Sequence, residues 1–469
     1  MFSKEIYIKR RQGLKDLMKS GVLLFLGNDE ASMNYRSNTY KYRQDSSFLY
    51  FFGIDHPGFA AVIDVDNNTE CIFANDVDMD DIIWMGHQPL VKDQAAEVGV
   101  NQSRAFNELN GVIAEAVKKG RKVHFLPPYR HDNMLLLEDL LGINPRQLKD
   151  HFSIELVKTV VQLRSVKEDG EIAEIEKACD VGYEMHVTAM QLCKPGTMEY
   201  TVAGAVEGVA LKHNGMVSFP VILSQNGETL HNHYHGNKLT EGKLMLTDAG
   251  AEIASHYASD YTRTAPVGGK FTQKQKEIYN IVLAANNRAF EISKPGITYQ
   301  SVHLESALVI AKGLTRLGLM KGDPAEAVRN GAHALFFPHG LGHMMGLDVH
   351  DMEDLGENNV GYDDEIQRST QFGLSALRMG RRLQKGFVMT VEPGIYFIPA
   401  LIAQWKRDKT NEAFLNFAKI EEYLDFGGIR LEDDILITDS GCRMLGSKRA
   451  PITVEEVEET MRVTFTHKN

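Results

Sequence analysis

Four acidic residues and one histidine stand where metal ligands would be expected. Asp248 (in KLMLTDAGAEI) and Asp260 (in SHYASDYTRTAPV) lie in two stretches whose apolar and polar residues alternate, as in half-buried strands. The residues between these stretches can turn back as a hairpin, which would bring the two carboxylates face to face. Because unpaired carboxylates inside an apolar sheet repel each other and are costly to desolvate, a hard divalent ion would suit the pair. Either aspartate alone is explained as well by a solvent-facing strand end.

Two further acids follow apolar, strand-like runs later in the chain. Glu392 lies in GFVMTVEPGIY and Glu432 in GGIRLEDDILIT. A strand of large apolar residues has little reason to carry a glutamate unless its carboxylate is paired or bound. Arg430 shares a strand face with Glu432, so an ion pair between them is one interpretation. Arg430 would remain a supporting partner if Glu432 binds metal.

The segment FFPHGLGHMMGLDVHD adds His339, His343 and His350. A lone histidine on an apolar background is more often a core residue than a ligand, but three among glycines favour a site, since glycine permits close backbone approach. The segment is not the zinc-protease motif H-E-x-x-H, because its glutamate is absent. The sequence also lacks a phosphate loop with the required spacing and a G-x-S-x-G nucleophile elbow.

Four carboxylates and one imidazole form an oxygen-rich ligand set suited to two divalent ions about 3.5 to 4 Å apart, with a bridging water as the nucleophile. Manganese suits this set better than a structural zinc would, and cobalt and zinc compete for it. We therefore expect a two-metal hydrolase, with manganese as the first choice.

Composition and charge narrow the remaining functions. A chain of 469 residues with 43% hydrophobic residues can bury the cores of two or three domains. The net charge of -12 disfavours nucleic acid as a partner. The four cysteines are far apart and form no C-x-x-C pair, and no apolar run is long enough to cross a membrane, so we expect reduced core cysteines and a cytoplasmic protein.

Sequence patterns predict two domains. Short apolar runs alternate with charged helical stretches between residues 21 and 157, as in an α/β domain, and the polar segment from Lys158 to Asp169 marks a boundary. We assign residues 1–160 to an N-terminal domain and 161–469 to a catalytic domain. In the second part, Lys-Pro-Gly ends a long helical pattern twice, at CKPGTMEY and SKPGITYQ, and strands with acids follow each time. Two such copies suggest a pseudo-twofold α/β domain with a site between its halves, although a helix-stop signal can also recur by chance.

The ordered motifs DAG, YASDYTRT, HGLGHMMGLDVHD, VEPGIY and GIRLEDD resemble the family of pita-bread peptidases that includes methionine aminopeptidase, prolidase and aminopeptidase P. The stretch YRQDSSFLYFFG (residues 42–53) is similar to the N-terminal domain of aminopeptidase P, so the resemblance covers nearly the whole chain. It implies an Xaa-Pro aminopeptidase with a pita-bread catalytic domain.

The resemblance also implies residue roles. Asp248 would bind one ion, Asp260 and Glu432 would bridge both, and His343 and Glu392 would complete the other. Glu392 would also relay a proton to the leaving amine. The remaining predicted active-site residues would bind substrate, stabilise the oxyanion or support the ligands: His231, His339, His350 and Arg430.

Some features leave alternatives open. The family's LHY is LHNHYHGN here, so His233 could replace His231 at the substrate. Residues 398–426 form an insertion that is either a flap limiting substrate length or a surface helix. A prolidase acting on dipeptides is the main rival, and a non-catalytic binding protein or a metal-free hydrolase on the same fold is a remote one. Relatives suggest a dimer or tetramer.

Overall fold

The computed structural model describes residues 2–462. The chain folds as two compact units: one runs to Arg164 and takes in Met352–Val360, and the other comprises Ser165–Asp351 and continues from Gly361. The predicted boundary between residues 160 and 161 falls inside α7 (Ile154–Ser165), which is one continuous helix. No helix among residues 2–462 is both long and apolar enough to span a membrane.

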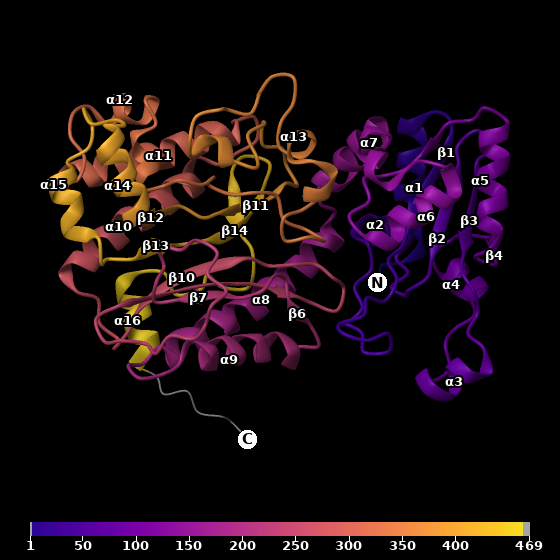
Figure 1. Ribbon diagram of the computed structural model, residues 1–469, viewed down its shortest axis with the longest axis horizontal. Coiled ribbons are helices and arrows are strands. Elements are labelled where there is room, and N and C mark those ends of the chain that lie inside the picture. Colours follow the sequence, from indigo (N-terminus) through magenta and orange to yellow (C-terminus); the bar gives the residue numbers. More distant parts are fainter. Residues whose placement is uncertain (1, 463–469) are drawn as a thin grey trace. The chain divides into compact units, whose positions relative to one another are not determined.

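The first unit is an α/β domain built on a mixed five-stranded sheet with strand order β4-β3-β2-β1-β5 (Figure 1). Its strands are β1 (Val22–Leu26), β2 (Ala60–Asp64), β3 (Thr69–Phe73), β4 (Ser103–Arg104) and β5 (Val123–His124). Its helices, besides α7, are α1 (Lys4–Met18), α2 (Ser46–Phe52), α3 (Met79–Met85), α4 (Val91–Glu97), α5 (Glu108–Lys118), α6 (His131–Leu141), η1 (Pro145–Asp150), η3 (Glu353–Leu355) and α13 (Glu357–Val360). Helices cover both faces of this sheet, because alternate residues of β1 point to opposite sides. Val22 and Leu24 pack with α5 and α6, whereas Phe25 contacts Phe51 and Phe52 of α2.

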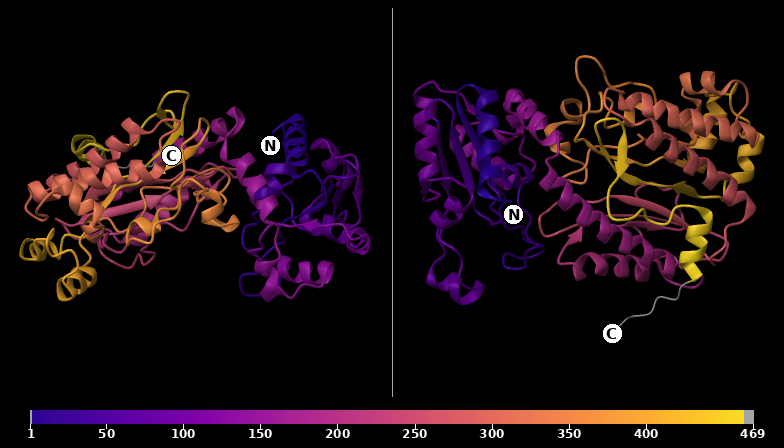
Figure 2. Two further views of the ribbon diagram at one scale, coloured as in Figure 1. Left: turned by 90° about the horizontal axis from the view of Figure 1, so that it is seen from above. Right: turned by 180° about the vertical axis from the view of Figure 1, so that it is seen from behind.

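The second unit holds two helix pairs with strands between them, as Figures 1 and 2 show. The helices are α8 (Asp169–Leu192), α9 (Glu199–Lys212), α10 (Gln273–Ile292), α11 (Tyr299–Arg316), α12 (Pro324–Arg329), η2 (Ala332–Leu335), η4 (Leu374–Ala376), α14 (Pro399–Asp408), α15 (Phe417–Ile420), η5 (Glu421–Tyr423) and α16 (Val454–Arg462). The strands are β6 (Met216–Val217), β7 (Ile222–Ser224), β8 (Leu244–Ala249), β9 (Ala251–Glu252), β10 (Tyr261–Pro266), β11 (Val388–Val391), β12 (Gly394–Tyr396), β13 (Gly428–Arg430), β14 (Asp433–Ile437) and β15 (Cys442–Met444). They form sheets in the orders β10-β8-β7 and β11-β14-β15, with the pairs β12-β13 and β6-β9 beside them.

The two Lys-Pro-Gly segments do end helices, and they do so in the same way. α8 ends just before the first segment and α10 just before the second. Gly196 and Gly296 both have φ of +88°, a left-handed conformation that glycine adopts without strain. Each glycine N–H then donates to the carbonyl of a leucine further along the chain, Leu239 or Leu383. The shared geometry supports the predicted pseudo-twofold arrangement.

The insertion of residues 398–426 forms α14, α15 and η5. Trp405 of α14 packs against Phe372, and Leu415 forms a backbone bridge with Met320. Its segments therefore cover part of the second unit rather than hanging free in solvent.

Candidate metal centre

The strands that carry Asp248 and Asp260 pair as predicted, with two corrections. β8 and β10 are antiparallel with Asp248 opposite Thr262, so Asp260, which directly precedes β10, is a diagonal rather than a direct neighbour. Every residue of both strands is buried, so the predicted half-buried alternation was wrong. Both faces are covered because α8 packs on these strands and β13 also contacts them.

Two backbone links bring the remaining ligand candidates to the same place. The Glu432 N–H donates to the Thr262 carbonyl at 3.0 Å, which joins the GIRLEDD segment to β10. Beside it, the His343 N–H donates to the Thr390 hydroxyl at 3.1 Å, and the Thr390 N–H returns a bond to the His343 carbonyl at 3.0 Å. Thr390 lies two residues before Glu392, so the histidine segment is fixed against the strand that ends at this glutamate.

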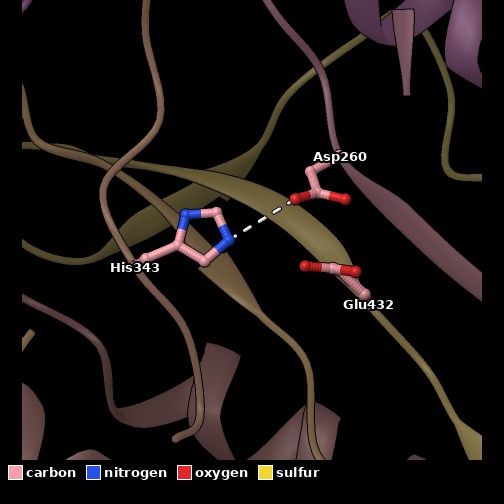
Figure 3. Close-up of side chains that lie close together, drawn as sticks. All are labelled: Asp260, His343 and Glu432. Atoms are coloured by element: carbon pink, nitrogen blue, oxygen red, sulfur yellow. Dashed lines mark ion pairs between the residues drawn. The ribbon is translucent and has the colours of Figure 1, made fainter. Parts of the chain in front are cut away.

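Asp260, His343 and Glu432 each offer a ligand atom, and these three atoms all lie within 4.8 Å of one another (Figure 3). His343 Nε2 is 3.4 Å from an Asp260 oxygen and 3.7 Å from a Glu392 oxygen. His343 Nδ1 lies 3.0 Å from the Met344 carbonyl, to which it can donate, and this assignment leaves the Nε2 lone pair directed at the acids.

Two of the buried carboxylates have an oxygen without a hydrogen-bond partner. Asp248 Oδ1 and Asp260 Oδ1 are buried and make no hydrogen bond. Burial, reinforced by the neighbouring carboxylates, raises the pKa of Asp260 and of Glu432 well above the usual range, and burial raises the pKa of Glu392. Among these four acids, Arg430 pairs with Asp248 alone, so keeping the other three carboxylates charged requires further cations. The donor set therefore fits hard divalent ions with oxygen and imidazole ligands.

One cavity of about 580 Å³ in the second unit is lined by all nine predicted site residues. These are Asp248, Asp260, His343, Glu392, Glu432, His231, His339, His350 and Arg430, and His233 lines the cavity as well. Both alternatives for the substrate histidine, His231 and His233, therefore reach the same cavity. No residue of the insertion, 398–426, lines the cavity, which gives no support to a flap.

The histidines and Arg430 have defined surroundings. The ring of His350 lies edge-on to that of His343, with centroids 4.4 Å apart. The Tyr396 hydroxyl accepts a hydrogen bond from Arg430 at 2.9 Å and lies 2.9 Å from His339 Nε2, to which it can donate. Burial lowers the pKa of His339 to about 3, so this imidazole stays neutral and its Nδ1–H can donate to the Gly340 carbonyl.

Arg430 does not pair with Glu432. Its guanidinium donates to Asp248 at 2.5 Å and to the Thr262 hydroxyl at 3.1 Å. The same hydroxyl donates to Glu432 at 2.8 Å. The ion-pair interpretation of Glu432 was therefore wrong, and Arg430 supports the other acid, with Thr262 linking the two.

Comparison with known proteins adds to this geometry. The model described as Metallopeptidase family M24 matches residues 173–439, more than half of the chain, and the model of the aminopeptidase P N-terminal domain matches residues 7–124. The chain belongs to metallopeptidase family M24. Its two domains are thus an aminopeptidase P-type N-terminal domain and a pita-bread catalytic domain, as the sequence predicted.

Individual relatives of this M24 chain carry both of the expected activities. It is 32% identical to the Xaa-Pro aminopeptidase of Escherichia coli (strain K12), covering 94% of this chain and 93% of that one. It is 30% identical to the Xaa-Pro dipeptidase of Homo sapiens, covering 95% and 89%. Among solved structures, a variant of E. coli aminopeptidase P in complex with substrate has a TM-score of 0.80 at 29% identity, with 98% of both chains covered. The M24 chain is therefore a metallo-aminopeptidase-type hydrolase that uses divalent metal ions and acts on peptides, which argues against the non-catalytic alternative.

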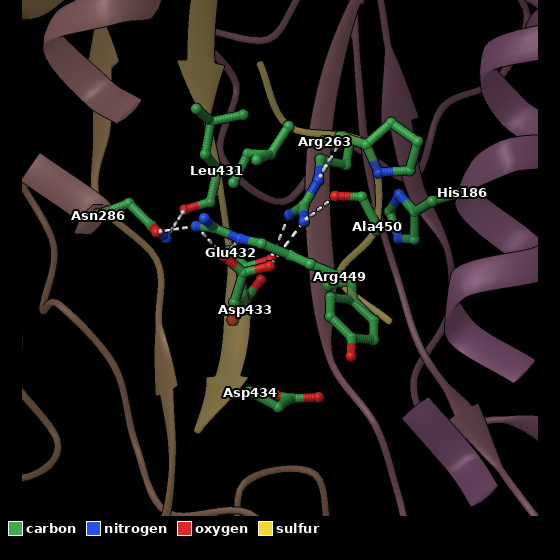
Figure 4. A network of polar contacts seen from close by, with 12 residues as sticks. His186, Arg263, Asn286, Leu431, Glu432, Asp433, Asp434, Arg449 and Ala450 are labelled. Atoms are coloured by element: carbon green, nitrogen blue, oxygen red, sulfur yellow. Dashed lines mark hydrogen bonds and ion pairs between the residues drawn. The ribbon is translucent and has the colours of Figure 1, made fainter. Parts of the chain in front are cut away.

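A buried network that includes Glu432 was not predicted from the sequence of this M24 peptidase (Figure 4). Arg263 donates to Asp433 at 2.6 Å and to the Glu432 carbonyl at 2.5 Å. Burial opposes the ionisation of Asp433, but Arg263 and Arg449 outweigh it and lower its pKa. The acids after Glu432 in GIRLEDD were a visible signal, since consecutive buried acids need partners.

Asn286 of α10 joins the backbone segments that lead directly to Glu392 and Glu432. Its amide nitrogen donates to the Val391 carbonyl at 3.0 Å and to the Leu431 carbonyl at 3.2 Å, and its oxygen accepts from Arg449 at 2.7 Å. One fully buried asparagine thereby fixes the backbone immediately before each glutamate. No sequence pattern predicts this role, because asparagine in a helix is usually unremarkable.

Proposed function

We propose that this M24 peptidase is an Xaa-Pro aminopeptidase, which releases the N-terminal residue from peptides with proline in second position. The observation that carries the proposal is the convergence of nine predicted side chains on one cavity, together with the aminopeptidase P-type N-terminal domain. The 0.80 TM-score to E. coli aminopeptidase P over 98% of both chains supports it.

We assign Asp248, Asp260, His343, Glu392 and Glu432 as ligands of two ions, with Mn²⁺ as the preferred metal. Bound ions of this kind polarise the scissile carbonyl and lower the pKa of water. Asp260 and Glu432 would bridge the ions. The two unpartnered buried oxygens on Asp248 and Asp260 support the assignment, because each lacks a protein donor.

The other residues act on the peptide. Glu392 accepts a proton from the attacking water and passes it to the leaving amine. His350 donates to the oxyanion, and His231 and His339 bind substrate. Arg430 positions Asp248 through the hydrogen bond described above.

The prolidase alternative is favoured by one observation, an arginine in the cavity that the sequence analysis did not single out. Arg378 lines the same cavity as His343 and Glu392. A guanidinium there suits the C-terminal carboxylate of a dipeptide.

Substrate length separates the two functions. We expect kcat/KM for an Xaa-Pro-Yaa tripeptide to equal or exceed that for the matching Xaa-Pro dipeptide, because an aminopeptidase needs no free carboxylate beside the proline. Steady-state kinetics with both peptides, with manganese added, measures this. The Arg378→Lys variant is the control, since a prolidase would lose dipeptide turnover selectively. Turnover of dipeptides alone would establish the alternative instead.

We further propose that the chain is a homo-oligomer. Four large apolar side chains of the short helix α3 are strongly exposed: Met79, Ile83, Trp84 and Met85, with 80% exposure for Trp84. Apolar side chains gathered in this way are typical of contact surfaces. The four free cysteines support a reducing, cytoplasmic location.

Light scattering tests the oligomer. The native chain is expected to run as a dimer or tetramer, and Ile83→Ser with Trp84→Ser is expected to shift it toward smaller species. Exchange of the exposed Leu211 for serine, which removes a similar side chain on α9, is the matched control. A native monomer at assay concentration would contradict the proposal.

A further inference from the structure

The loop that carries His231 and His233 runs from residue 225 to residue 243, between β7 and β8, and contains no helix or strand. Both imidazoles line the cavity, yet both residues are exposed. Inside the loop, the Thr229 N–H donates to the Asn226 carbonyl at 3.1 Å, and the Gln225 side chain bonds to the Lys238 carbonyl at 3.1 Å and to the Thr240 N–H at 2.9 Å. Contacts from outside the loop add to these bonds in fixing the orientation in which the imidazoles would meet a substrate.

Glu199, the first residue of α9, reaches both ends of this loop. Its Oε1 accepts from the Ser224 hydroxyl at 3.0 Å and from the Gln225 N–H at 2.8 Å. Its Oε2 accepts from Asn237, at 2.8 Å from the amide nitrogen and 3.3 Å from the backbone N–H. One carboxylate thus takes one hydrogen bond from the last residue of β7, one from the first residue of the loop and two from Asn237, twelve residues later.

Because this carboxylate is buried, its hydrogen bonds replace the water that would otherwise stabilise it. Glu199 is 0% exposed, and none of the ion pairs among the described residues includes it. A charged carboxylate withdrawn from water without a cation must be stabilised by hydrogen bonds, and bonds to charged acceptors are the stronger kind. The four donors all come from the histidine loop and its β7 edge, so the loop and the carboxylate stabilise each other.

We propose that Glu199 is a positioning residue that clamps the loop of His231 and His233, and so sets where these histidines meet the peptide. Its effect on peptide binding rests on the proposed peptidase function, whereas the clamp itself does not. Backbone bonds from Glu199 and Tyr200 to Asn237 and His235 hold the far end in addition. The Gln225 side chain also bonds to Lys238 and Thr240, so removing the Glu199 carboxylate is expected to loosen the link between the two parts of the loop.

The clamp is tested by hydrogen–deuterium exchange of residues 226–236 in metal-loaded protein. Exchange in Glu199→Ala is expected to rise by roughly tenfold or more, the factor that losing a charge-assisted hydrogen bond represents. Glu199→Gln should fall between Ala and native, because its amide retains one acceptor oxygen. Glu207→Gln, the same charge change at an exposed site on α9, should match the native protein. Native exchange in folded Glu199→Gln and Glu199→Ala would overturn the proposal.

Kinetics test the positioning step. Glu199→Gln is expected to raise KM for a proline peptide more than it lowers kcat, with the bound metal content unchanged by elemental analysis. Because Glu199 acts through the loop, its effect should shrink in a His231→Ala, His233→Ala background. Fully additive effects would show that Glu199 stabilises the fold without positioning the histidines. Faster exchange in a protein that cleaves no proline peptide would sustain the clamp and refute the proposed function instead.

Discussion

Asp260→Asn is expected to abolish peptide hydrolysis while leaving the protein folded. The substitution keeps the shape of the side chain but replaces a charged ligand oxygen shared by both proposed ions. The loss should exceed the roughly 10- to 100-fold typical of removing an outer partner of a metal ligand. The backbone should stay in place, because the Asp260 N–H bond to Asp434 at 3.0 Å does not involve the changed carboxylate.

Activity, metal content and thermal unfolding measured on one preparation test this prediction. Asp364→Asn, the same change at an exposed position, is the matched control and should retain native activity. Bound metal is expected to fall below two ions per chain in the Asp260 variant alone. Full activity of the native protein after rigorous metal removal would refute the two-metal scheme altogether.

The metal-free protein is expected to lose stability as the pH rises above about 4, the ordinary carboxyl pKa, whereas the metal-loaded protein is not. Burial and neighbouring carboxylates raise the folded-state pKa of Asp260 and of Glu432. A raised carboxyl pKa stabilises the fold fully below the unfolded value near about 4, and this contribution disappears as the pH rises through the folded value. Bound cations favour the ionised carboxylates and remove the effect.

Thermal unfolding at several pH values, with and without chelator, measures the difference. Each unit of raised pKa corresponds to about 1.4 kcal/mol when fully expressed, so a shift of several degrees in Tm is expected for the chelated protein. Asp260→Asn should flatten the dependence, because one of the repelling acids is then neutral. Parallel curves with and without chelator would show that the acids bind no cation.

Much of the fold and of the site could be predicted from local sequence, because the relevant signals are local. Apolar runs placed β1, β2 and β3, and the Lys-Pro-Gly segments placed the ends of α8 and α10. The four acidic ligand candidates were recognisable because a carboxylate after an apolar run needs a partner, and His343 because three histidines cluster among glycines. Strand register was not recognisable, which is why Asp260 was expected directly opposite Asp248.

The parts that escaped prediction depend on contacts between distant segments. Asn286 and Glu199 contact the site only through backbone groups or a loop far away in sequence, so their residue types carry no local signal. Likewise, Arg430 lies two residues from Glu432 but bonds to Asp248, because β13 faces β8 in the folded chain. Tertiary packing therefore determines which of two nearby acids forms the ion pair with an arginine.

The acidic ligand candidates are divided between the two halves of the second unit, and this division affects how the metal site forms. Asp248 and Asp260 come from the first half, and Glu392 and Glu432 from the second, where Asn286 bonds to the residue before each glutamate. Neither half alone gathers more than two of the four acids. The second unit can therefore bind two cations tightly only after its two halves have folded together. Metal uptake should accordingly accompany a late step of folding.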